Sequence, residues 1–167
     1  MNETFLRILK TLYALEHAME NAMILCQSWG FNGLKRKYRL YSTYLHYAIR
    51  QIECEMYDYH ELAAPLNEEA YPAYHPSNIE DHLTKWAAMM RDVVSNLVMA
   101  NKVLIPAIGK QNCYVEDVLK LCYKEKCKSI RMAKRFNEAG LHDLHMCDDI
   151  LHKKMKQCEA EEVPKWI

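Results

Sequence analysis

The sequence ELAAPLNEEAYPAYHPS, residues 61–77, contains prolines at positions 65, 72 and 76 and shows no helical period. Because proline lacks a backbone N–H and disrupts the interior of a helix, this stretch predicts a connection between helices. About 17 residues of extended chain can span about 55 Å, whereas a helix of about 26 residues is about 39 Å long. The connection is therefore long enough to run the whole length of a helical bundle.

Long helices are predicted on both sides of this connection, because apolar residues recur there at helical spacing. The other turns are short, from Gly30 to Gly33 and from Pro106 to Gly109, so each joins two antiparallel helices. Two such hairpins joined by one long crossover form the ferritin-like four-helix bundle. Asn78 is the expected N-cap of the third helix. The expected all-α domain covers residues 1–167, with helices at about 3–29, 34–60, 78–105, 113–139 and, as a short fifth C-terminal helix, 141–159.

The composition supports a helical fold and excludes several classes of function. With 4 glycines and 5 prolines in 167 residues, the chain is poor in the residues that β-sandwiches and glycine-rich phosphate loops require. The 22 basic residues balance the 22 acidic ones, so we expect no binding to nucleic acid or to a membrane surface. The 7 cysteines form no C-x-x-C pair, and charges interrupt residues 1–26 where a signal segment would lie. These features predict a cytoplasmic protein with reduced thiols.

The first turn and the second helix resemble those of the bacterioferritins. The turn Ser28-Trp-Gly-Phe-Asn-Gly-Leu34 and the charged run Lys35-Arg-Lys-Tyr-Arg39 are similar to the bacterioferritin segment in which Trp-Gly and an aromatic residue lead into the second helix. The resemblance is specific over residues 26–60, and elsewhere it consists of helix order and length. It implies an iron-handling oligomer of at least two copies, with haem and with iron or another transition metal as its cofactors.

The same resemblance implies that this chain lacks the di-iron ferroxidase centre. Apolar residues occupy the positions that carry Glu and Glu-x-x-His on the first three bacterioferritin helices: Leu12, Leu45, Ala48 and Val93. On the fourth helix, Cys122-Tyr-Lys-Glu-Lys-Cys127 stands in place of the second Glu-x-x-His. Because a buried di-iron pair needs several carboxylates to neutralise it, we expect no catalytic residue and no enzymatic activity of the chain on its own.

Glu16 lies in the inward stripe of the first helix, one turn after Leu12. An unpaired buried carboxylate is costly. We therefore expect Glu16 to be partly exposed, hydrogen-bonded to a tyrosine, or paired with Lys126 on the inner side of the fourth helix. A role for Glu16 as a metal ligand is the alternative.

The resemblance places His46 where bacterioferritins carry the methionine that ligates haem across a two-fold dimer interface. Two copies of His46 would supply both axial nitrogens of one haem. The alternative is an interfacial or surface histidine, four residues before Arg50.

The last helix carries a polar face opposite Leu144, Cys147 and Leu151. Its imidazole and carboxylate groups recur every three or four positions, a pattern that suits Zn²⁺, Ni²⁺ or Cu²⁺. The predicted metal ligands are His142, His145, Asp149 and His152. The alternative is a solvated polar face on an amphipathic helix.

These observations predict a bacterioferritin-like subunit that lacks its own ferroxidase centre and is a structural or haem-bearing member of an iron-handling oligomer. Its expected partners are further copies of the chain and, in a mixed oligomer, a ferroxidase-competent subunit. Two alternatives stay open: a helical-bundle interaction module without metal, and a metal-binding protein that uses the histidines of the last helix.

Overall fold

The computed structural model describes residues 2–59 and 73–159, and this part of the chain is helical with short connections and contains no strand. The predicted all-α class is therefore confirmed. The elements are α1 (Asn2–Ser28), α2 (Asn32–Tyr59), α3 (Ile79–Ile108) and α4 (Cys113–Glu159). The predicted crossover falls largely on residues 60–72, which lie outside the described residues.

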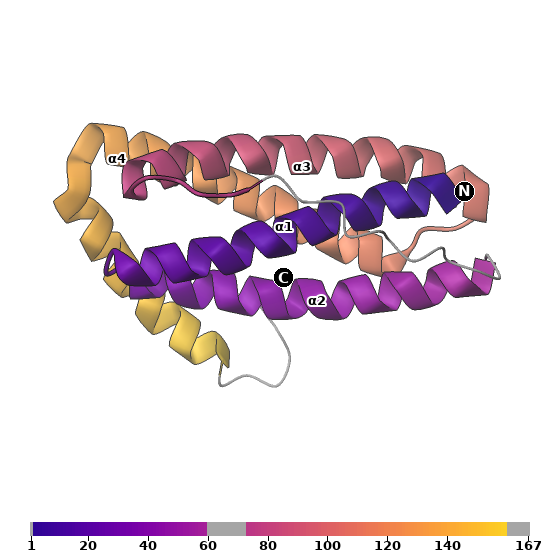
Figure 1. The fold of residues 1–167 in the computed structure, drawn as a ribbon, viewed down its shortest axis with the longest axis horizontal. Helices are drawn as coiled ribbons and strands as arrows, with labels where there is room; N and C mark the ends of the chain where they lie inside the picture. Colours follow the sequence, from indigo (N-terminus) through magenta and orange to yellow (C-terminus); the bar gives the residue numbers. More distant parts are fainter. Residues whose placement is uncertain (1, 60–72, 160–167) are drawn as a thin grey trace.

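The helices form a four-cornered bundle in which α1 and α4 lie at opposite corners. α1 packs against α2 and α3, and α4 packs against the same two helices. Figure 1 shows that α2 and α3 run in the same direction, while α1 and the first part of α4 run the opposite way. α2 thus ends at the opposite end of the bundle from the start of α3, which is the direction that a full-length crossover requires.

The structure confirms the predicted start of α3 and corrects its predicted end. Asn78 is the N-cap, since its side chain accepts a hydrogen bond from the backbone N–H of Asp81 at 2.9 Å. The predicted end at residue 105 is wrong, because the helix continues through Pro106 to Ile108. A proline near the end of a helix interrupts only its last turn, which limits the cost. Gly109, with φ 70°, then ends the helix in the left-handed conformation that glycine favours.

α4 bends sharply at Gly140, whose φ of 79° and ψ of −168° are not helical. We call residues 113–139 the N-terminal arm and residues 141–159 the C-terminal arm. The predicted helix end at this glycine is confirmed by its non-helical backbone, and the residues after it form the second helical part of α4. Arg135 and Asp143 lie on either side of the bend and form a two-pronged ion pair, with N–O distances of 2.7 and 2.9 Å. Figure 1 shows the C-terminal arm folded back along the bundle.

The C-terminal arm is anchored on the first turn of α2. The carboxylate of Asp148 accepts hydrogen bonds from the backbone N–H groups of Gly33 at 3.0 Å and Leu34 at 2.8 Å. Because the first N–H groups of a helix have no partner within it, this contact supplies the missing acceptor and places negative charge at the positive end of α2. The ring of His145 also stacks on Phe31, with centroids 4.4 Å apart.

Candidate functional site

The positions matched to di-iron ligands lie in the apolar core. Leu12, Leu45 and Ala48 are fully buried and Val93 is nearly so. They belong to one continuous core of aliphatic, aromatic and sulfur-containing side chains. The interior at these positions therefore offers packing contacts and no carboxylate.

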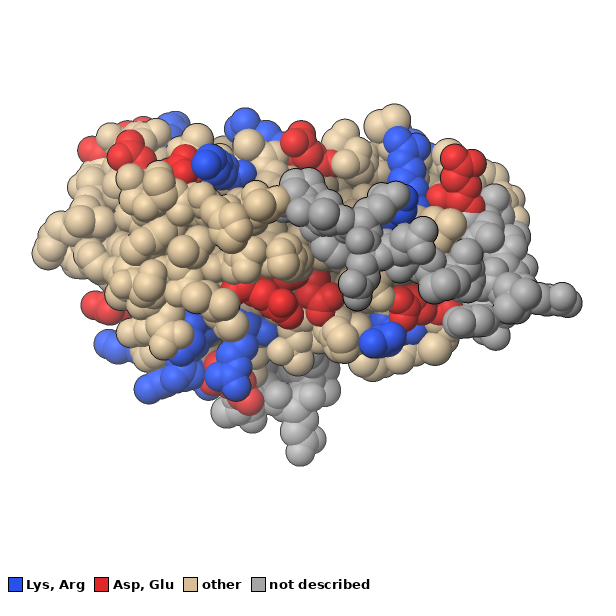
Figure 2. All heavy atoms as spheres, viewed as in Figure 1, with Lys and Arg blue, Asp and Glu red and all other residues tan. Residues whose placement is uncertain are grey.

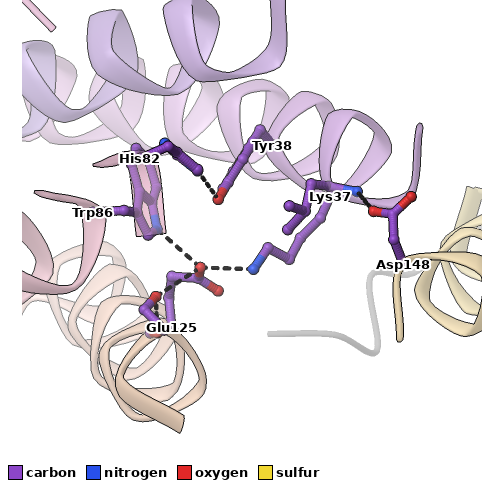
Figure 3. A network of polar contacts seen from close by, with 8 residues as sticks. Lys37, Tyr38, His82, Trp86, Glu125 and Asp148 are labelled. Atoms are coloured by element: carbon purple, nitrogen blue, oxygen red, sulfur yellow. Dashed lines mark hydrogen bonds and ion pairs between the residues drawn. The ribbon is translucent and has the colours of Figure 1, made fainter. Parts of the chain in front are cut away.

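A buried ion pair crosses the bundle from α2 to α4. The ammonium of Lys37 donates to Oε1 of Glu125 at 2.8 Å, and these residues are only 4% and 0% exposed. The same carboxylate oxygen accepts hydrogen bonds from Nε1 of Trp86 at 3.1 Å and from the hydroxyl of Ser129 at 3.1 Å. Figure 3 shows these side chains converging from three helices. Several donors on one buried carboxylate offset the cost of removing its charge from water.

A buried histidine stands beside this pair. His82 is fully buried, with Nε2 2.8 Å from the hydroxyl of Tyr38 and Nδ1 2.7 Å from the hydroxyl of Tyr74. Burial first, and the positive charge of Lys37 second, lower the pKa of His82 to about 3. The imidazole is therefore neutral at physiological pH, so it donates to one tyrosine and accepts from the other.

We expect His82 to make the stability of the protein depend on pH below 7. Because the pKa is lower in the folded protein than in the unfolded chain, the unfolded chain binds more protons as the pH falls through 6.5, and stability is lost. Between pH 7.5 and 5.0 the loss attributable to His82 is about 2 kcal/mol. Urea unfolding at both pH values measures it. The loss should shrink by that amount in His82→Gln and persist in His75→Gln, which alters an exposed histidine. Equal losses in all three proteins would contradict this assignment.

Two buried thiols complete this interior. Burial raises the pKa of Cys26 to about 12 and that of Cys122 to about 12. Both side chains stay protonated at physiological pH, and a protonated thiol is a poor nucleophile and a poor metal ligand. Together with the neutral histidine, they belong to a packed and hydrogen-bonded interior.

Glu16 and His46, which were predicted separately, lie together on the outer side of the bundle. Nδ1 of His46 is 2.9 Å from Oε1 of Glu16, and the two side chains are 58% and 13% exposed. The partner of Glu16 is thus His46 and not Lys126, which lies over the ring of Tyr123. Burial raises the pKa of Glu16, and the contact with His46 opposes that shift.

A second polar contact joins the same two helices, α1 and α2. The hydroxyl of Tyr13 donates to Glu53, and Arg50 forms an ion pair with the same carboxylate at 3.2 Å. We call Tyr13, Glu16, His46, Arg50 and Glu53 the outer seam. Within the seam, Glu16 contacts His46, and 58% of the His46 side chain stays exposed.

The predicted metal ligands of the C-terminal arm do not converge within one chain. His142, His145 and Asp149 are exposed, and His152 is half-buried. Across residues 2–59 and 73–159, no group of three or more His, Cys, Asp or Glu side chains is arranged to hold a metal ion. A site that uses these residues would need ligands from elsewhere, and it stays a prediction.

Sequence reasoning missed the residues that the structure buries. Lys37 follows Leu34 by three positions and precedes Tyr41 by four, so it occupies the inward stripe of α2. Glu125 holds the equivalent place between Cys122 and Ser129 on α4. A basic residue on the inward face of one helix and an acidic residue on the inward face of another were the signal from which this buried ion pair could have been predicted.

Comparisons with protein-family models, with curated proteins and with solved structures gave no match. Among the described residues, no helix combines the length and the apolar character needed to span a membrane. Fold and site together define a helical bundle with an ion-paired interior and a histidine held at its surface by a carboxylate.

Proposed function

We propose that this chain is a ferritin-like subunit of the bacterioferritin kind that lacks its own ferroxidase centre and ligates haem through His46. The observation that carries the proposal is the contact between Nδ1 of His46 and Oε1 of Glu16. A carboxylate that accepts from one ring nitrogen fixes the tautomer of a histidine and leaves the other nitrogen free to ligate a metal. With Nδ1 directed at Glu16, Nε2 is the ligating atom.

The exposure of His46 supports ligation between two chains. At 58% exposure the side chain can approach a second copy related by a two-fold axis, and His46 of each copy would then hold the haem iron. Haem bound in this way supplies a one-electron redox centre. The outer seam orients the imidazole, and Glu16 carries a charge opposite to that of the bound iron.

The surface of the bundle also favours an oligomer. Figure 2 shows a wide area without charged side chains at the left of this view, where α1 ends and α3 begins in Figure 1. On α1, Ile24 is 61% exposed. Uncharged areas with exposed apolar side chains are typical of surfaces that pack against another protein.

The apolar core supports a structural role within the oligomer. With Leu12, Leu45 and Ala48 at the matched positions, iron oxidation would be the task of a ferroxidase-competent partner subunit. In a mixed oligomer this chain would contribute packing contacts between subunits and a ligand for haem.

Reconstitution with haemin tests the haem proposal. We expect one haem for every two chains, with the absorption spectrum of a six-coordinate, low-spin bis-histidine haem. His46→Ala should abolish that spectrum, while His17→Ala, which removes an exposed histidine from α1, should keep it. Glu16→Gln should weaken binding about 10- to 100-fold, because it removes the carboxylate that orients the ligand. An unchanged spectrum in His46→Ala would refute the proposal.

A metal-free interaction module is the second candidate, and the closed interior favours it. The acid and the base buried near Trp86 are paired with each other, and the imidazole of His82 is hydrogen-bonded to two tyrosines, so the bundle can be stable without a cofactor. Light scattering and metal analysis of the purified protein separate the candidates. A colourless, metal-free monomer that takes up no haemin supports the module, and a haem-bearing dimer or larger assembly supports the first proposal.

A further inference from the structure

A pocket of about 400 Å³ lies between α2 and the two arms of α4. This volume is within the range of small-molecule sites. The bend at Gly140 creates the pocket, because it turns the C-terminal arm back so that both arms face the same part of α2. The pocket is separate from His46 and the outer seam, so its function does not depend on the haem proposal.

The walls of the pocket are rich in positive charge. Lys128 and Arg131 come from the N-terminal arm and Lys154 from the C-terminal arm. Within the described residues none of these three forms an ion pair, whereas Arg135 and Asp143, which also line the pocket, are paired with each other. Figure 2 shows blue side chains gathered at the lower left, where Figure 1 shows the C-terminal arm. A concave wall of unpaired cations attracts and concentrates anions.

A buried ammonium closes the inner end of the pocket. Lys37 lines it and is only 4% exposed, and its contact with Glu125 uses one of its three N–H donors. Burial first, and the positive charges of Lys37 and Lys154 after it, lower the pKa of Lys128. A negative group placed between these side chains would relieve that repulsion.

The remaining lining is apolar. Tyr41 contributes from α2, Met132 and Phe136 from the N-terminal arm, and Leu151 from the C-terminal arm. An anion such as free phosphate would gain nothing from this surface, whereas a ligand with an apolar body would bury it. Each arm of α4 contributes both cations and apolar side chains, so the pocket selects a molecule that has both an acidic and an apolar part.

We propose that this pocket binds a small amphiphilic anion, with its acidic head group held by Lys128, Arg131 and Lys154 and its apolar body packed against Tyr41 and Phe136. The shared chemistry is a carboxylate or phosphate monoester on a short alkyl or aryl body. Calorimetric titration of the full chain with decanoate, decyl phosphate and 1-decanol tests the proposal. The two anions should bind at least about tenfold more tightly than the alcohol, because only they form charge-assisted hydrogen bonds. The tighter of the two identifies the head group.

Variants locate the site. Lys128→Gln/Arg131→Gln should weaken binding of the anions at least about tenfold. Lys120→Gln/Lys134→Gln removes the same charge from exposed positions on the same arm and should leave binding unchanged. Equal effects of the two double variants, or equal affinity for decanol and decanoate, would overturn the proposal.

A chemical readout on the unaltered protein covers the case in which the first double variant fails to fold. Cys147 lines the pocket, whereas Cys113 is exposed at the start of α4. Bound decanoate should slow the alkylation of Cys147 by iodoacetamide and leave that of Cys113 unchanged, as measured by peptide mass spectrometry. Saturation with decanoate without protection of Cys147 would place the ligand elsewhere and overturn the proposal.

Discussion

Gly33→Ala is expected to detach the C-terminal arm of α4 from the start of α2. A Cβ atom at this position would lie 2.2 Å from the backbone oxygen of Asp148 and 2.9 Å from the backbone nitrogen of His152. Backbone atoms cannot yield as a flexible side chain can, so the C-terminal arm must move. The hydrogen bonds that the first turn of α2 donates to the carboxylate of Asp148 are then lost. We expect a loss of about 2 kcal/mol or more.

Hydrogen exchange measures this detachment directly. Amides of residues 141–159 should lose protection in Gly33→Ala, while those of α1 and α3 keep most of theirs, because the four packed helices do not require the arm. Asn32→Ala, at the exposed neighbouring position, should change stability by no more than about 0.5 kcal/mol. Full protection of the arm in Gly33→Ala would show that the close approach at Gly33 does not hold it.

Lys37→Met is expected to destabilise the protein by about 3 to 5 kcal/mol, because it leaves Glu125 buried without its counter-ion. The double variant Lys37→Met/Glu125→Leu should recover most of this loss, since an apolar pair of similar volume needs no compensation for buried charge. Urea unfolding of Lys37→Met, Glu125→Leu and the double variant gives a double-mutant cycle, which isolates the interaction free energy between the two side chains.

An exposed ion pair on α4 supplies the control for this cycle. Lys120 lies 3.9 Å from Asp117, with both side chains largely exposed. Lys120→Met should cost less than about 0.5 kcal/mol, because water screens such pairs. A cost for Lys37→Met as small as that for Lys120→Met would mean that the charge of Glu125 is satisfied without the lysine.

The helices were largely predictable because their signals are local. The spacing of apolar residues located all four elements, and Asn78 was recognisable because its side chain accepts from a backbone N–H only three residues later. Pro106 misled the prediction because a local rule gives a proline the same weight in the middle of a helix and in its last turn. Gly140 was identified as a break, but the sequence did not indicate where the arm beyond it would pack.

The candidate site was less predictable because its contacts join distant segments. Asp149 was chosen as a ligand, whereas its neighbour Asp148 turns inward, and about 100° of rotation around the helix separates the two. Glu16 and His46 were both singled out, but their pairing depends on the register between α1 and α2. Helical periodicity fixes which face a residue occupies and says nothing about how far one helix slides along the next.

The contact between Asp148 and the first turn of α2 can form only late in the synthesis of the chain. Asp148 follows Gly33 by 115 residues. At about 5 to 20 residues per second, a ribosome needs about 6 to 23 seconds to synthesise that interval. For most of this time, once residue 59 has been made, the hairpin of α1 and α2 is complete in sequence, but the first turn of α2 has no acceptor from the C-terminal arm. The nascent chain therefore presents an open helix end that only the late part of synthesis closes.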